Sequence, residues 1–470
     1  MTWLIRHIPR RRVLALGWDC AGPDLVFNQL RAELPVTSRL MAGGTWGLLD
    51  SCIPCITVPA WTSMLSSRDP GVLGIYGFRN RADHSYDAMT TATSAAVRLP
   101  RVWDYLSAAG RASIVLGVPQ TYPVTPLAGH MVSCFLTPSA DSVFTFPAVF
   151  REDVLRAVPD YRFDVKDFRT ADKDWLLRQL FDLAEVQHRL ALRCIETLDW
   201  DFFIQVHIGL DRLHHGFWRY HDPRHRLHEP GSRFADAVAS YYRMLDEMAG
   251  ELIERSGDGT IVLVVSDHGV KRMDGGICVN EWLWRAGWLS FNAPPPDGQL
   301  TRFEDLDVNW AGTRAWASGG YYARIFLNVA GREPQGVVSP AAYSETRAEL
   351  ACLLASLPDP TGAPLRTLVF VPEDIYSAVN GVAPDLLVYF GDLHWRAVGS
   401  LGHGRHYTLE NDTGPDDANH AQQGLFILYD PRQTGAGRRE SAHNIMDIAP
   451  TVLQRLGVRV PRELQGRALS

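Results

Sequence analysis

Three aspartates and three histidines follow or precede apolar segments of this chain, where their side chains could bind metal ions together. Asp267 and His268 end the apolar run 261–266 and are followed by Gly269. A strand that is apolar at nearly every position is covered on both faces, as in a parallel sheet, and ligands of such sheets collect at the carboxyl ends of the strands. Adjacent strand residues point to opposite faces, so both side chains can reach one ion only where the chain turns. We expect Gly269 to allow that turn, because glycine tolerates backbone angles that other residues avoid.

The same pattern recurs at other apolar runs. Residues 13–17 lead to Asp19, and residues 202–206 lead to Asp211, with His215 four residues later. If a helix begins near Asp211, this spacing puts carboxylate and imidazole on one helix face. His420 precedes a further apolar run, 424–428. One such Asp is more often a helix N-cap, and one such His a packed or solvated group, but the recurrence favours a site for two metal ions.

Thr57 is the candidate nucleophile. Pro59 follows closely and fits the first turn of a helix, so we expect Thr57 just before a helix N-terminus, where backbone amides favour anions. A threonine hydroxyl is a poor nucleophile at neutral pH, but a coordinated metal ion favours its alkoxide. The alternative is a threonine that only caps the helix, and the local pattern alone favours that alternative.

Several short segments together resemble the alkaline phosphatase superfamily, most closely its type I phosphodiesterase/nucleotide pyrophosphatase branch. The resemblance spans residues 13 to 468 and is carried by Thr57–Ser63, Arg68–Ile75, Val118–Pro123, Asp211–Trp218, Ser266–Gly269, Asn280–Leu283, Gly331–Pro334 and Asp447–Thr451. It implies an α/β fold, a three-layer sandwich of the alkaline phosphatase type with a mostly parallel central sheet and inserted cap segments.

The resemblance also implies a ligand set for two divalent metal ions. One ion would be held by Asp19, Thr57, Asp267 and His268, and the other by Asp211, His215 and His420. The family usually carries zinc, and nitrogen and oxygen ligands without thiolate also suit manganese. Thr57 would attack phosphorus to give a phospho-threonine intermediate, which water then hydrolyses. His403 and His406 are weaker candidates than His420, whose place before the final apolar run better matches the family.

The substrate is less defined than the chemistry. Nucleotide pyrophosphatases usually carry an Asn three residues after the nucleophile, where this chain has Ala60; this departure weakens a nucleotide assignment more than it weakens phosphoryl transfer. Arg79, Asn80, Arg81 and Lys271 could contact phosphate oxygens, with solvated surface positions as the alternative. We expect hydrolysis of a small phosphate ester, a phosphodiester or nucleotide-type pyrophosphate. A phosphomonoesterase or phosphomutase, and a binding protein without catalysis, are the alternatives.

Composition excludes some classes of function and indicates one large domain. The chain has 470 residues, 46% of them hydrophobic, and a net charge of −7, which argues against a nucleic-acid polymer as partner. No window approaches 18 apolar residues, so no membrane span is expected. Arg10–Arg12 resembles a twin-arginine signal, but the apolar stretch after it ends at Asp19, too early for a signal peptide. The seven cysteines are scattered, and we expect a cytoplasmic protein.

The expected organisation is a single catalytic domain over residues 1–470 with two additions. Residues 79–185 are interpreted as a partial insertion within the core. Residues 294–400, which open with Pro294–Pro296, are interpreted as a cap that sets specificity and contains a strand near 322–327. Long helices are predicted over 173–197 and 240–256, each before one of the strands that end near a candidate ligand.

Overall fold

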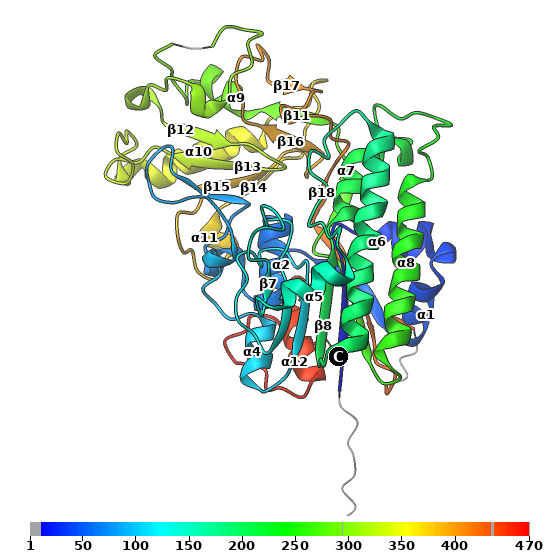
Figure 1. The fold of residues 1–470 in the computed structure, drawn as a ribbon. Coiled ribbons are helices and arrows are strands. Elements are labelled where there is room, and N and C mark those ends of the chain that lie inside the picture. Colours follow the sequence, from blue (N-terminus) through cyan, green and yellow to red (C-terminus); the bar gives the residue numbers. More distant parts are fainter. Residues whose placement is uncertain (1–10, 294, 434–436, 470) are drawn as a thin grey trace, which may run out of the picture.

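A ten-stranded sheet lies at the centre of the computed structural model, which describes residues 11–293, 295–433 and 437–469 (Figure 1). Arg10 and Pro294 lie outside the described residues. The strands in spatial order are β20 (Arg438–Arg439), β2 (Thr45–Asp50), β19 (Gln423–Tyr429), β9 (Ile261–Val265), β1 (Val13–Trp18), β8 (Phe202–His207), β5 (Ser113–Leu116), β6 (Gly129–Val132) and β7 (Thr145–Phe146), with β21 (His443–Asn444) pairing with β2.

The strands that precede the candidate ligands run in one direction. β1 is parallel to both β8 and β9, and β5 is parallel to β8 and β6, whereas β19 is antiparallel to β9 and β2. The predicted mostly parallel sheet is therefore confirmed. The register places Gly17 opposite both Val206 and Val265. The carboxyl ends of β1, β8 and β9 consequently meet at one edge of the sheet, as the apolar runs predicted.

Helices cover both faces of the sheet, which completes the three layers (Figure 1). One face carries α1 (Pro35–Gly43), α6 (Lys173–Thr197), α7 (Gly209–His221) and α8 (Ala237–Ser256); the other carries α2 (Thr57–Ser66), α4 (Val102–Ala108) and α12 (Ile448–Arg455). Alternate residues of β1 enter the two cores: Leu14 and Leu16 pack with the first set, and Val13 and Ala15 with the second. This alternation explains why β1 and β9 carry no charged or strongly polar side chain.

Both predicted long helices are present. α6 has the predicted bounds, and it starts where the Asp172 carboxylate accepts a hydrogen bond from the Trp175 amide at 3.0 Å, a side-chain cap of the usual type. α8 begins at Ala237, three residues before the predicted start.

A separate lobe with its own core stands at one end of the sheet (upper part of Figure 1). It contains an antiparallel sheet with the order β12 (Ala315–Ser318), β13 (Ala323–Leu327), β15 (Leu386–Tyr389) and β14 (Leu368–Phe370). A smaller sheet has the order β16 (Trp395–Val398), β11 (Gly275–Cys278) and β17 (Tyr407–Thr408), and the helices are α9 (Val279–Arg285), α10 (Tyr343–Ala355) and α11 (Pro372–Ile375). The segment 294–400, interpreted as a cap, thus shares this lobe with β11, α9 and β17.

The segment 79–185, interpreted as a partial insertion, contributes β5, β6 and β7 to the central sheet and α4 to its flank. The hairpin of β3 (Arg79–Arg81) and β4 (Met89–Thr91) forms its own small sheet, and α5 (Phe150–Ala157) follows β7. The short α3 (Pro70–Leu73) follows α2. Within the part of the chain that the structure describes, no helix combines the length and apolarity needed to cross a bilayer.

Candidate metal centre and nucleophile

Asp19, Asp211 and Asp267 come together at the carboxyl ends of three adjacent strands. Asp19 follows β1, Asp211 follows β8 and Asp267 follows β9. Their exposed fractions are 0%, 1% and 0%, respectively. The parallel register therefore gathers three carboxylates, distant in sequence, in one buried position.

The helix α7 brings an imidazole to the same position. It begins at Gly209, two residues before Asp211, so Asp211 lies in its first turn and His215 one turn later. His215 Nε2 lies 3.3 Å from Asp211 Oδ1. The spacing of four residues thus places both groups on one helix face, as predicted.

His420 reaches this centre through a two-stranded ribbon. It lies in β18 (Ala418–Ala421), which pairs antiparallel with β10 (Gly269–Arg272) so that His420 stands opposite Val270. The rings of His268 and His420 stack with their centroids 4.0 Å apart, and His420 Nε2 lies 3.6 Å from Asp211 Oδ1. His403 is elsewhere, 3.0 Å from the Ser400 hydroxyl in the lobe.

Gly269 was predicted to allow a turn after His268, but the structure gives a different reason for a glycine at this position. Its φ does not lie in the left-handed region, so the turn after His268 makes no special demand on the backbone. A Cβ atom at this position would instead stand 2.3 Å from the Gln423 carbonyl oxygen. The glycine permits close approach of β19, a tertiary contact that the local sequence does not reveal.

The donor atoms form two overlapping groups. Asp211, His215 and His420 form one, Asp19, Asp211 and His268 form the other, and within each group the donor atoms lie within 4.8 Å of one another. Asp267 Oδ2 lies 3.2 Å from His268 Nε2, beside the second group. Asp211 belongs to both groups and lies between them.

Five of the donor atoms at this centre have no hydrogen-bond partner, and the nearest polar atoms to several of them are other donors of the centre. The five atoms are Asp19 Oδ1, Asp211 Oδ1, Asp267 Oδ2, His215 Nε2 and His420 Nε2. A buried polar atom without a partner costs about 1–3 kcal/mol, so such a concentration would be strongly unfavourable by itself. Carboxylate oxygens and imidazole nitrogens are the ligands that zinc prefers when thiolate is absent. The residues therefore fit a pair of divalent ions.

The other atom of each carboxylate is held by the protein. Asp19 Oδ2 accepts a hydrogen bond from Trp61 Nε1 at 2.6 Å, Asp211 Oδ2 accepts one from Arg212 Nη1 at 2.7 Å, and Asp267 Oδ1 accepts one from the Cys20 amide at 3.1 Å. Each carboxylate is thus fixed on one side and open toward the centre on the other.

The imidazoles are oriented in the same way. His268 Nδ1 donates to the Gly269 carbonyl at 3.1 Å, and His420 Nδ1 donates to the Cys55 carbonyl at 3.0 Å. A proton held at Nδ1 leaves Nε2 with a free lone pair, the form that binds metal.

The electrostatics of the centre favour added positive charge. Burial raises the pKa of Asp19 well above its ordinary value, and the Asp211 charge raises it further. Burial and the Asp19 charge likewise raise the pKa of Asp267. Burial lowers the pKa of His268 to about 4 and that of His420 well below its ordinary range. The imidazoles of His268 and His420 are therefore neutral ligands beside crowded carboxylates.

Thr57 is the first residue of α2, and its hydroxyl adjoins the centre. Oγ1 lies 3.5 Å from His268 Nε2, and the residue is 1% exposed. The N-cap position belongs to Ile56, and no side chain caps this helix. The alternative that Thr57 serves as an N-cap is therefore wrong, and its hydroxyl is free to act at a helix N-terminus that favours anions.

Three of the four residues considered for substrate contacts bind other groups of the protein. Arg81 is buried and pairs with Glu333 at 3.1 Å, and Lys271 Nζ lies 3.1 Å from Asp392 Oδ2. Asn80 Oδ1 accepts from the Tyr76 amide at 2.8 Å. Arg79 is exposed on β3. Their role in substrate binding stays a prediction.

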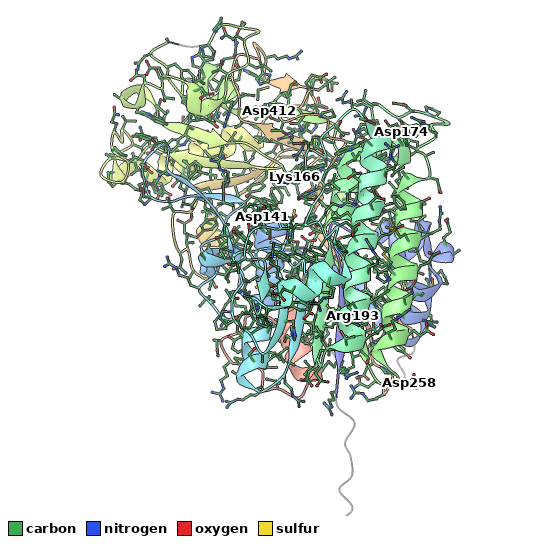
Figure 2. All side chains as sticks on the ribbon, in the orientation of Figure 1. Asp141, Lys166, Asp174, Arg193, Asp258 and Asp412 are labelled. Carbon is green, nitrogen blue, oxygen red and sulfur yellow. The ribbon has the colours of Figure 1, made fainter. Side chains whose placement is uncertain are left out.

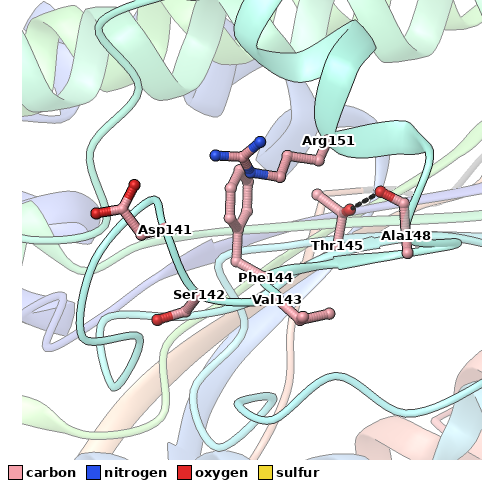
Figure 3. Close-up of a pocket in the computed structure, with 7 residues that line it drawn as sticks. All are labelled: Asp141, Ser142, Val143, Phe144, Thr145, Ala148 and Arg151. Atoms are coloured by element: carbon pink, nitrogen blue, oxygen red, sulfur yellow. Dashed lines mark hydrogen bonds between the residues drawn. The ribbon is translucent and has the colours of Figure 1, made fainter.

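A separate hollow of about 270 Å³ lies between β7 and the start of α5 (Figure 3). Asp141, Phe144 and Arg151 contribute to its lining. It contains none of the converging donor atoms, so it is distinct from the candidate metal centre.

Comparison with known proteins supports the same family. The model of the family described as type I phosphodiesterase / nucleotide pyrophosphatase matches residues 13–416. His420 lies just beyond the matched region, and the structure brings it to the centre. No protein with a curated description matches the sequence.

Solved structures share the fold at low sequence identity. Human ectonucleotide pyrophosphatase / phosphodiesterase 5 has a TM-score of 0.56 at 13% identity, over 97% of each chain. Its murine counterpart, in an inactive form in complex with AMP, has a TM-score of 0.56 at 13% identity, over 96% of each chain. Phosphonoacetate hydrolase from Sinorhizobium meliloti 1021, in complex with phosphonoformate, has a TM-score of 0.59 at 16% identity, over 95% of this chain and 96% of that one.

The family match covers most of the chain, and the fold agrees with it. The protein therefore belongs to the type I phosphodiesterase/nucleotide pyrophosphatase family of the alkaline phosphatase superfamily and is a metal-dependent phosphoric ester hydrolase.

Proposed function

We propose that this protein cleaves a small phosphate ester, most favourably a phosphodiester or a nucleotide-type pyrophosphate, with two metal ions and a threonine nucleophile. The observation that carries the proposal is the set of five buried donor atoms without hydrogen bonds beside the Thr57 hydroxyl. The family match supports the class of substrate, and AMP in the murine structure supports a nucleotide-like ligand.

The ligands divide between two ions. Asp19, Thr57, Asp267 and His268 would hold one divalent ion, and Asp211, His215 and His420 would hold the other. Zinc fits these nitrogen and oxygen donors best, and manganese is compatible. When bound, the two ions polarise the phosphoryl group and neutralise charge on the attacking and leaving oxygens.

The residues of the chain perform the transfer in two steps. Thr57 gives up its hydroxyl proton and Oγ1 forms an ester bond to phosphorus, while the bond from phosphorus to the leaving oxygen breaks and that oxygen departs with the electron pair and takes up a proton. The N-terminus of α2 favours the negative charge of the phosphoryl group bound to Thr57. Water then cleaves the phospho-threonine bond, which restores the hydroxyl and releases phosphate or a phosphomonoester.

Rates on paired model substrates test the substrate class. We expect bis-p-nitrophenyl phosphate to be hydrolysed with a higher kcat/KM than p-nitrophenyl phosphate, in the presence of zinc or manganese. A preference for the monoester would favour the phosphomonoesterase alternative. Phosphonoacetate belongs in the panel because a hydrolase of that compound shares the fold. Turnover of none of these by metal-loaded protein would contradict the proposal and favour a phosphomutase or a binding protein.

Removal of metal should lower thermal stability by several degrees. Without cations, the buried carboxylates of Asp19, Asp211 and Asp267 repel one another, and their open oxygens have no hydrogen-bond partner. A ligand that binds only the folded state stabilises it by about 2.7 kcal/mol at a hundredfold excess over its Kd. Calorimetry before and after dialysis against a chelator measures the shift, and added zinc should reverse it. An unchanged Tm in protein shown to have lost its metal would count against the site.

We also propose that the protein is located in the cytoplasm. All seven cysteines are free, six of them buried, as expected where thiols stay reduced. Fractionation of cells that express the protein would test it.

A further inference from the structure

The Asp416 carboxylate links His215 to two arginines and a tyrosine, and the proposed reaction does not use it. Asp416 Oδ1 accepts a hydrogen bond from His215 Nδ1 at 2.7 Å. Its other oxygen accepts from Arg169 Nε at 3.1 Å and from the Tyr321 hydroxyl at 3.2 Å. The side chain of Asp416 is fully buried. A buried carboxylate with three donors is therefore attached directly to a candidate metal ligand.

This hydrogen bond is the strongest restraint on the His215 ring. The ring lies against Tyr321, with centroids 4.9 Å apart and planes 22° apart, and more loosely against Phe168 at 6.2 Å. Such stacking restricts tilt but not which nitrogen holds the proton. The Tyr321 hydroxyl is farther from Nδ1, at 3.4 Å, than Asp416 is. The contact with Asp416 therefore fixes Nδ1 as a donor and turns Nε2 toward Asp211 Oδ1, 3.3 Å away.

Two arginines balance the charge of Asp416. Arg169 contacts it directly, and Arg396 Nη1 lies 4.0 Å from its Oδ2 with a side chain only 6% exposed. Both guanidinium groups stand over the Tyr321 ring, at 5.8 Å and 5.7 Å from its centroid. A buried carboxylate keeps its charge only when it is paired in this way.

The partners of Asp416 come from the lobe and from the part of the molecule built around the central sheet. Asp416 lies in the connection from β17 to β18, and Arg396 belongs to β16 of the lobe, whereas Arg169 precedes α6 in the body. Figure 2 labels Asp412, in the same connection, above Lys166 in the segment that precedes α6. A Cβ on Gly414 would stand 3.1 Å from the Arg169 Cβ, so the two segments are in close contact.

We propose that Asp416 is a positioning residue that orients His215 for the ion held by Asp211, His215 and His420, with Arg169 acting through Asp416. The inference rests on the proposed function, because it assigns a role toward that ion. A carboxylate on the far nitrogen of a ligating imidazole fixes its tautomer and orientation and makes it a better ligand, and loss of such a partner typically costs about 10–100-fold in metal affinity or activity.

The first test compares Asp416→Asn with Asp417→Asn. The adjacent Asp417 is a matched control, since it is equally buried and pairs with Arg219 at 2.8 Å, while its carboxylate has no described bond to a candidate ligand. We expect Asp416→Asn to lower the affinity for one of the two ions by about 10–100-fold, measured by competition with a chelator, while the other ion stays bound. Excess metal should largely restore kcat. Asp417→Asn should bind both ions with affinities near those of the wild type.

A second variant covers the case in which Asp416→Asn does not fold. Arg169 is partly exposed, so Arg169→Gln should fold. It should lower the affinity for the same ion, but by less than Asp416→Asn does. Where both single variants fold, the double variant should bind this ion as tightly as Asp416→Asn does, because Arg169 acts through Asp416.

The outcomes separate the two proposals. Suppose that the wild-type protein binds two ions. If Asp416→Asn then binds both with the affinities of the Asp417→Asn control, the positioning role is wrong and the proposed function stands. Arg169→Gln decides the same question where Asp416→Asn does not fold. If wild-type protein binds no metal in zinc- or manganese-containing buffer, both are wrong.

Discussion

Thr57→Ala should reduce turnover by roughly a thousandfold or more while the two metal ions remain bound, because removal of a nucleophile leaves only the catalysis that binding and charge stabilisation supply. Thr57 Oγ1 adjoins His268 Nε2 at 3.5 Å. The carboxylates and imidazoles that make up the rest of the ligand set are untouched by the substitution. Steady-state rates on the diester, together with elemental analysis of the purified variant, measure both parts of this expectation.

Two controls make this result specific. Thr57→Ser keeps a hydroxyl and should keep a substantial part of the activity. Thr62→Ala removes another buried threonine of α2, whose hydroxyl bonds to the Val58 carbonyl at 2.8 Å, and should affect stability more than chemistry. If Thr57→Ala retained the wild-type rate, direct attack of water on phosphorus would replace the phospho-threonine mechanism.

Asp211→Asn should cost the protein most of its bound metal and bring activity below detection. Asp211 is the residue common to both donor groups, and its Oδ1 is one of the buried oxygens without a hydrogen bond. The amide is isosteric but uncharged, so it removes negative charge from the position between the two ions. We expect the loss of both ions rather than one, measured as metal content per chain and as a lower Tm.

Asp222→Asn is the control for this substitution. Asp222 follows the last residue of α7 and pairs with Arg224 at 2.9 Å, away from the converging donors. It should leave metal content unchanged. Retention of both ions by Asp211→Asn would show that Asp211 is not needed to hold the ion assigned to Asp211, His215 and His420, and would require a different division of the donors.

The parts of the site that were predictable from sequence depend on strand and helix geometry. Apolar runs before Asp19, Asp211 and Asp267 predict buried parallel strands, and parallel strands deliver their carboxyl ends to one edge. The spacing of Asp211 and His215 predicts one helix face, and α7 provides it. Thr57 and His420 were candidates from their places beside a predicted helix start and an apolar run, but only the family resemblance favoured them over ordinary polar residues.

The remaining parts depend on contacts between segments far apart in the chain. Trp61 holds Asp19 across 42 positions, and Asp416 holds His215 across 201 positions. No periodicity or local spacing marks such a partner. The role of Gly269 escaped prediction for the same reason, since the atom that excludes a side chain there is the Gln423 carbonyl oxygen.

The ribbon of β10 and β18 has a consequence for how the lobe can move. Both of its strands carry a candidate ligand at or beside the end nearest the sheet: His268 precedes β10, and His420 lies within β18. The lobe is therefore tethered at the metal centre itself, and a large swing would pull His420 away from Asp211. We therefore expect the lobe to keep its position relative to the sheet while metal is bound at Asp211 and His420.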